Sequence, residues 1–83
     1  MASIGKIFRR DDSGEATGAP ISVVFDLTVG HISGWDDPEF DSDFARNNLG
    51  NAFILVSTDL VSALEIVFVS ERGHFRITQA RTA

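Results

Sequence analysis

The clearest pattern in the chain is an alternation of apolar and polar side chains over residues 21–29. This period of two predicts a strand with one packed and one mostly polar face, which is more often part of an antiparallel sheet than of a parallel one. Gly30 ends the pattern. The apolar row consists of Ile21, Val23, Phe25, Leu27 and Val29.

Residues 52–80 hold the largest concentration of apolar side chains, and the rest of the chain must pack onto them. The run 52–56 is apolar without alternation, which is typical of a central strand covered on both faces. Residues 65–70 and 74–80 are rich in β-branched and aromatic side chains and flank a short turn that contains Gly73. We therefore expect them to pair as an antiparallel hairpin.

Residues 60–70 fit both a helix and a strand. Their apolar residues also fall at helical spacing, Thr58 or Asp59 offers an N-terminal cap, and Gly73 offers a C-terminal stop. The pattern alone does not decide between the two structures. We favour a short helix over 58–64 that leads into the hairpin.

Three further segments complete the prediction. Residues 4–9 alternate imperfectly and predict a short strand, in which Gly5 permits a bulge or a close backbone approach. Residues 11–20 are almost all turn formers and predict a mobile loop. A short helix is expected near 43–49, with acids at its N-terminal end and with Phe44 and Leu49 facing the core.

Together these elements predict a small single domain, residues 1–83, of the α+β class. One or two short helices would pack on an antiparallel sheet of four to five strands. Inspection shows no internal repeat. The strands are expected at 4–9, 21–29, 52–57, 65–70 and 74–80.

The composition of the chain makes some classes of function less favourable than others. The chain has 83 residues and no cysteine, so its stability must come from packing or association. A net charge of −5 makes direct nucleic-acid binding an unfavourable expectation. The N-terminal residues do not form a secretory signal, and no apolar run approaches the roughly 20 residues that span a bilayer. We therefore expect a cytoplasmic protein that does not enter a membrane.

The acids are concentrated in the segment 30–43, around the only tryptophan. An aromatic anchor with an acidic rim suits a protein partner with a basic surface. The same acids could instead begin the helix that follows, and the tryptophan could fold back over the edge of the core. The predicted partner-binding residues are Trp35, Asp36, Asp37, Glu39 and Asp41.

The acidic segment does not match a metal site well, and we expect no metal and no cofactor. Its alternating carboxylates resemble a calcium loop, but Ser42 stands where such a loop needs glycine and Asn48 where it needs a bidentate glutamate. A transition-metal site would join His31 to Asp36 or Asp37, yet a single loop histidine near acids is usually a surface residue.

Basic residues collect near both ends of the chain. If the terminal strands were neighbours, these residues would form one basic contact patch, although charged side chains on terminal strands also protect sheet edges. The predicted patch consists of Arg9, Arg10, Arg72 and Arg76.

No catalytic signature is present, because no nucleophile, base and orienting group can be assembled from the sequence. We therefore predict a non-enzymatic protein-binding module. More specifically, we predict a small acidic inhibitor of the phage or mobile-element type. It would block a nucleic-acid-handling partner with carboxylates placed where phosphates would bind. The alternatives are a structural homo-oligomer or particle component, and a small-ligand or ion-binding module that uses His31, Trp35 and the nearby acids.

Overall fold

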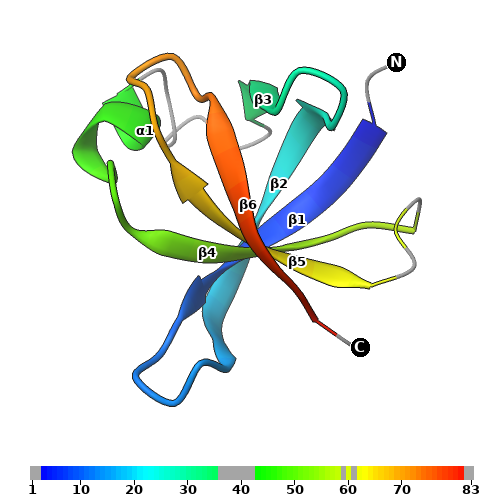
Figure 1. Cartoon of the computed structure of the whole chain (residues 1–83), viewed down its shortest axis with the longest axis vertical. Helices are drawn as coiled ribbons and strands as arrows, with labels where there is room; N and C mark the ends of the chain where they lie inside the picture. The colour runs from blue at the N-terminus through cyan, green and yellow to red at the C-terminus, as the bar shows by residue number, and fades with distance from the viewer. Residues whose placement is uncertain (1–2, 36–42, 59, 61, 82–83) are drawn as a thin grey trace.

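The structure is a computed structural model that describes residues 3–35, 43–58, 60 and 62–81. Within these residues the chain forms six strands and one short helix (Figure 1). All six strands belong to one antiparallel sheet, which curls into a half-barrel. The elements are β1 (Ser3–Arg10), β2 (Ala16–Asp26), β3 (His31–Trp35), α1 (Asp43–Asn47), β4 (Ala52–Val56), β5 (Ala63–Phe68) and β6 (Phe75–Arg81).

The predicted α+β class is wrong, because the fold is mostly β and has six strands instead of four or five. The helix expected over 58–64 is wrong for the described residues of this range, none of which is helical, and Ala63 and Leu64 already belong to β5. In β5, Ile66 and Phe68 are buried and the strand pairs with β4 on one side and β6 on the other. Burial in a sheet with partners on both edges outweighs a helical spacing of apolar residues.

Two segments that were expected to be loops contribute strand. β3 lies within the predicted acidic loop 30–43, and β2 begins at Ala16, inside the predicted loop 11–20. The turn between β1 and β2 is therefore confined to residues 11–15. The division into a single domain stays a prediction.

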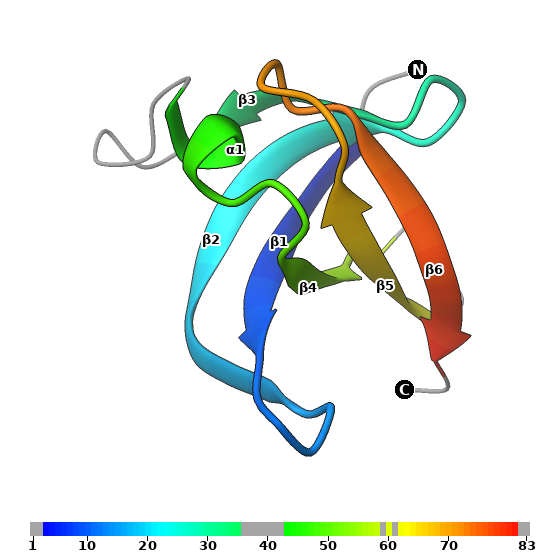
Figure 2. The ribbon, with the colours of Figure 1, turned by 60° about the vertical axis from the view of Figure 1, so that its left-hand side comes forward.

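The strand order is β3-β2-β1-β4-β5-β6, so β1 and β4 lie at the centre of the sheet. The two outermost strands meet at one point, where His31 and His74 form an isolated antiparallel bridge. Ile32 N–H donates to Gly73 C=O at 2.9 Å, and Phe75 N–H donates to Gly30 C=O at 2.7 Å. We call this junction the seam, because it joins the margins of the half-barrel at one end (Figure 2).

The register reveals an approximate two-fold repeat that inspection of the sequence missed. β1-β2-β3 and β4-β5-β6 are equivalent meanders, and the strand order reads the same from either end. Gly5 pairs with Val23 in the first meander, and the equivalent pair in the second meander is Phe53 with Ile66. The central strands β1 and β4 pair at Ile7 and Leu55, which occupy equivalent positions in the two meanders. The two-fold axis passes through this pair and through the seam.

The sequences of the two meanders retain a trace of the repeat. Residues 21–32 (ISVVFDLTVGHI) align without a gap with residues 64–75 (LEIVFVSERGHF). Each outer strand also has a bulge, where the hydroxyl of Ser33 donates to Val24 C=O at 3.5 Å and that of Thr78 donates to Glu65 C=O at 3.1 Å. The identical positions are Val24/Val67, Phe25/Phe68, Gly30/Gly73 and His31/His74.

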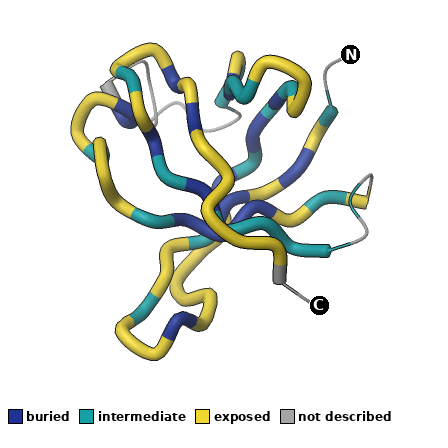
Figure 3. The backbone as a smooth tube through the Cα atoms, in the orientation of Figure 1, coloured by how far each residue is buried: buried dark blue, intermediate teal, exposed yellow. Residues whose placement is uncertain are grey.

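The core fills the concave side of the sheet, where buried positions alternate along the strands (Figure 3). α1 closes one end of this interior, since Phe44 is buried with its ring centroid 5.5 Å from that of Phe53 and 6.0 Å from that of Phe68. Leu49, expected in the core, is 45% exposed. The core cluster consists of Ile7, Ile21, Val23, Phe25, Ile32, Phe44, Ala45, Phe53, Leu55, Ile66, Phe68 and Phe75.

The prediction for β4 is confirmed. The strand lies between β1 and β5, and Phe53, Ile54 and Leu55 are all buried despite pointing alternately to opposite faces. Ile54 lies outside the core cluster, because it faces the convex side of the sheet. That side therefore contains apolar surface of its own.

Candidate functional site

The convex face of β1, β2 and β4 has a shallow apolar hollow of about 490 Å³. Ile4 is 74% exposed beside it, and Val56 is 42% exposed. Among the described residues that line the hollow, Lys6 alone carries a charge. We call this surface the outer apolar face. The lining residues are Ile4, Gly5, Lys6, Phe8, Ser22, Val56, Ser57 and Thr58.

The sequence of β1 explains why these side chains point outward. Gly5 belongs to the row of β1 residues that face the core. An added Cβ atom there would come within 2.7 Å of the Val56 carbonyl oxygen and 2.8 Å of the buried Phe25 ring. This agrees with the close backbone approach expected at Gly5. Since Gly5 and Ile7 face the core, alternation turns Ile4, Lys6 and Phe8 to the convex side.

A second hollow of about 340 Å³ adjoins the first and extends the outer apolar face toward β3. Both hollows share Ile4 and Ser22, and the second ends at Val24, Gly34 and Trp35. An exposed isoleucine thus lies between two hollows on one continuous surface. Contiguous exposed apolar surface of this kind is typical of contact sites.

Trp35 packs against the core and is also partly exposed, while its role in binding a partner stays a prediction. Its ring packs against Phe44, with a centroid distance of 5.0 Å, and against Phe68, at 6.0 Å. It therefore covers the edge of the core between β3 and α1. It also stays partly exposed, where it lines the second hollow.

The other predicted partner-binding residues, Asp36, Asp37, Glu39 and Asp41, lie outside the described residues, and their role stays a prediction. Within the described part of the chain, no three His, Asp or Glu side chains are placed to share a metal ion. No helix in the same part is long and apolar enough to cross a membrane.

The structure does not bring the four predicted arginines together. Arg9 and Arg10 are on β1, whereas Arg76 is on β6 and Arg72 is in the turn before it. β4 and β5 lie between these strands in the sheet. The terminal strands are not neighbours, because the two meanders join through their first strands and leave β6 at a margin.

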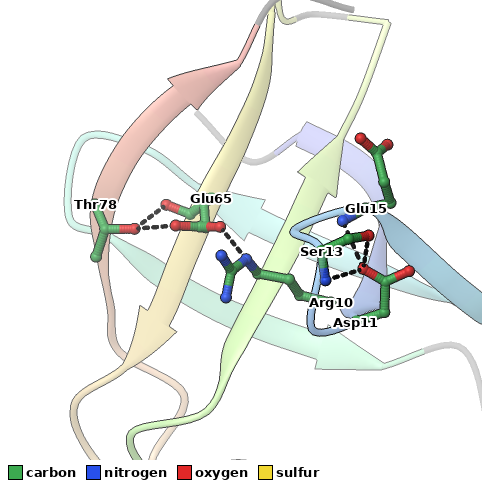
Figure 4. Close-up of polar contacts among 6 residues, drawn as sticks. All are labelled: Arg10, Asp11, Ser13, Glu15, Glu65 and Thr78. Carbon is green, nitrogen blue, oxygen red and sulfur yellow. Dashed lines mark hydrogen bonds and ion pairs between the residues drawn. The ribbon is translucent and has the colours of Figure 1, made fainter.

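Arg9 and Arg10 make different contacts because they face opposite sides of β1. The Arg9 guanidinium carbon lies 5.9 Å from the Phe44 ring centroid and 6.0 Å from that of Phe53, which is cation–π range. Arg10 forms an ion pair with Glu65 on β5, with Nε and Oε1 2.7 Å apart (Figure 4). The Thr78 hydroxyl donates to the other Glu65 carboxylate oxygen at 3.2 Å.

The turn after β1 is organised by Asp11, whose Oδ1 accepts the Ser13 hydroxyl at 2.7 Å, the Glu15 backbone N–H at 2.8 Å and the Ser13 backbone N–H at 3.0 Å. The Ser13 hydroxyl and then the Glu15 N–H lower the pKa of the Asp11 carboxyl below its ordinary value. The Thr28 N–H likewise lowers the pKa of Asp26. Both carboxylates organise turns that join strands.

The two histidines lie side by side at the seam, with ring centroids 4.5 Å apart. His31 Nε2 is 2.8 Å from the Arg72 carbonyl oxygen, to which it donates. His74 Nδ1 is 2.8 Å from the Ser70 hydroxyl. One nitrogen of each ring is therefore committed to the local structure of the seam.

Sequence analysis missed the outer apolar face, although its signal was present in β1 and β4. Ile4 and Phe8 lie an odd number of residues from Ile7, so they point to the opposite face of β1 from this core residue. A scan against models of protein families and searches among curated proteins and solved structures found no match, so function is inferred from the site alone.

Proposed function

We propose that the chain is a non-enzymatic protein-binding module whose contact surface is the outer apolar face. The observation that supports this proposal is Ile4, a large apolar side chain that is 74% exposed between two adjoining hollows. Burying such a side chain in a partner contributes about 1.5–3 kcal/mol. Trp35, at the far end of the second hollow, is a residue type enriched among binding hot spots.

The charge of the chain favours a different protein with a basic surface over a second copy. With a net charge of −5, two copies repel one another, whereas a basic partner is attracted and oriented. Asp36, Asp37, Glu39 and Asp41 follow Trp35 directly in the sequence. They would surround the apolar contact with carboxylates, and such an arrangement suits an inhibitor that occupies a phosphate-binding surface.

The test uses a photo-reactive amino acid at position 4 to capture the partner. The captured protein is then purified, and its affinity for the chain is measured by calorimetry. We expect Ile4→Glu to weaken binding at least about tenfold, since it buries a charge in an apolar contact. Val29→Glu is the matched control, because Val29 is also apolar and 67% exposed but lies in the turn after β2.

Two outcomes would overturn the proposal. Equal affinity for Ile4→Glu and the unchanged chain would exclude the outer apolar face as the contact. A salt-resistant dimer in light scattering that Ile4→Glu converts to monomer would instead assign this face to self-association, which is the structural alternative.

A further inference from the structure

The two margins of the sheet are equivalent by the two-fold repeat but end differently. β3 stops at Trp35, whose ring packs against Phe44 of α1. β6 continues to Arg81, and among the described residues it pairs beyond the seam with β5 alone. In Figure 2 β6 leaves the seam and diverges from β2 and β3. Within the described residues, therefore, the margin at β3 is covered and the margin at β6 is open.

At the open margin, backbone groups of β6 that point away from β5 have no partner in the part of the chain that the structure describes. Phe75 N–H points away from β5, since it donates across the seam to Gly30 C=O. Backbone groups alternate along a strand, so the N–H and C=O of Ile77 point to the same side. Continuing the antiparallel register past the seam would place Thr28 opposite Ile77, but Thr28 belongs to the turn after β2. A row of free donors and acceptors is a template for another strand.

The side chains of β6 indicate which kind of strand would fit. Arg76 is exposed and pairs in register with Val67, on the convex face. Ile77 pairs with the buried Ile66, yet remains 46% exposed. The sequence of β6 contains Arg76 and Arg81 and no acidic residue, and the preceding turn contains Glu71 beside Arg72. An incoming strand would therefore meet a cation, Arg76, on one face and an apolar side chain, Ile77, on the other.

We propose that β6 binds an extended acidic segment of another protein, which adds to the sheet as a seventh strand. Backbone hydrogen bonds to Ile77 would supply affinity, and alternating acidic and apolar side chains would supply specificity. A second copy of β6 is a poorer occupant, because it would bring further arginines and no carboxylate to this margin. This site is separate from the outer apolar face and does not depend on it.

The probe is an alternating Glu-Val peptide of about the length of β6, with a Lys-Val peptide as its counterpart. Titration is followed by NMR, together with hydrogen exchange of the Ile77 amide. We expect the Glu-Val peptide to bind with shifts centred on β6 and to slow exchange at Ile77. We expect the Lys-Val peptide to bind at least about tenfold more weakly.

Two variants separate the backbone from the charge. Ile77→Pro removes the outward N–H without removing a hydrogen bond to β5, so it should abolish binding in a folded chain. Arg76→Glu should weaken the Glu-Val peptide about tenfold and strengthen the Lys-Val peptide. Arg46→Glu, at an exposed position on α1, makes the same charge change elsewhere and should leave both affinities unchanged.

Several results would overturn the proposal. These are equal binding of the two peptides, shifts centred away from β6, or an unaltered affinity in Arg76→Glu. A dimer in light scattering that Ile77→Pro dissociates would assign the open margin to a second copy. Ile4→Glu should leave peptide binding intact, so failure of this proposal is distinguishable from failure of the contact at the outer apolar face.

Discussion

Gly73 is the residue on which the seam depends most directly. Its φ is +93°, and an added Cβ atom would come within 2.7 Å of the Ile32 carbonyl oxygen across the seam. We predict that Gly73→Ala lowers the free energy of unfolding by about 3 kcal/mol, since it combines a left-handed backbone with a clash against main chain. Urea denaturation measures the change.

Gly18 provides the matched control for this substitution. Its φ is +79°, but nothing lies within 4 Å of an added Cβ atom. Gly18→Ala should therefore lower the free energy of unfolding by only about 1–2 kcal/mol, the effect of the left-handed backbone alone. Equal losses for the two variants would show that the seam contributes nothing beyond backbone strain.

For individual residues, the sequence predicted structure correctly where only one residue type suits the position. The close approach expected at Gly5 is present, because no side chain fits between β1, Val56 and Phe25. It failed where burial depends on tertiary structure. Leu49 was expected to face the core together with Phe44, but α1 ends at Asn47 and leaves Leu49 exposed.

The ion pair between Arg10 and Glu65 connects strands that are not neighbours, since β4 lies between β1 and β5. The Glu65 side chain is only 16% exposed, while that of Arg10 is 40% exposed. Solvent at Arg10 therefore weakens the attraction between the two charges. A double-mutant cycle with Arg10→Gln and Glu65→Gln should give a coupling energy of about 0.5–1 kcal/mol. Thermal unfolding of the four proteins measures it.

Thr78→Val is the control substitution for that cycle, because it removes the hydroxyl that donates to the Glu65 carboxylate. It should weaken the fold without abolishing the coupling between Arg10 and Glu65. Strictly additive effects of the Arg10 and Glu65 substitutions would mean that the pair does not stabilise the curled sheet.

Elements were predicted well where local pattern and tertiary partners agree. β1, β4 and β6 lie within about two residues of their expected positions, which is the usual uncertainty at strand ends. β3 was missed because its sequence, HISGW, contains a Gly and has no clear alternation. It forms because Ile32 is buried opposite Phe25 on β2. That partnership is not visible in a local pattern.

The repeat is the feature of the whole molecule that the sequence concealed most. Its two halves differ in the length of the connection between their first and second strands, so no single spacing relates all positions. The identities lie in the second strands, at Val24/Val67 and Phe25/Phe68, and at the seam, at Gly30/Gly73 and His31/His74. The strand register shows which residues of the two halves are equivalent, because the backbone pairing is the same even where the side chains differ.

Both halves contribute to one core cluster, so they should unfold as one unit. Native-state hydrogen exchange tests this. Amides of β1 and β4, which have a paired strand on each side, should exchange only through global unfolding. The outward amide of Ile77 should exchange about a hundredfold faster or more, because it has no partner strand. If residues 52–81 were protected to a different degree from residues 3–35 throughout, the meanders would be independent units and the seam would be a contact between two domains.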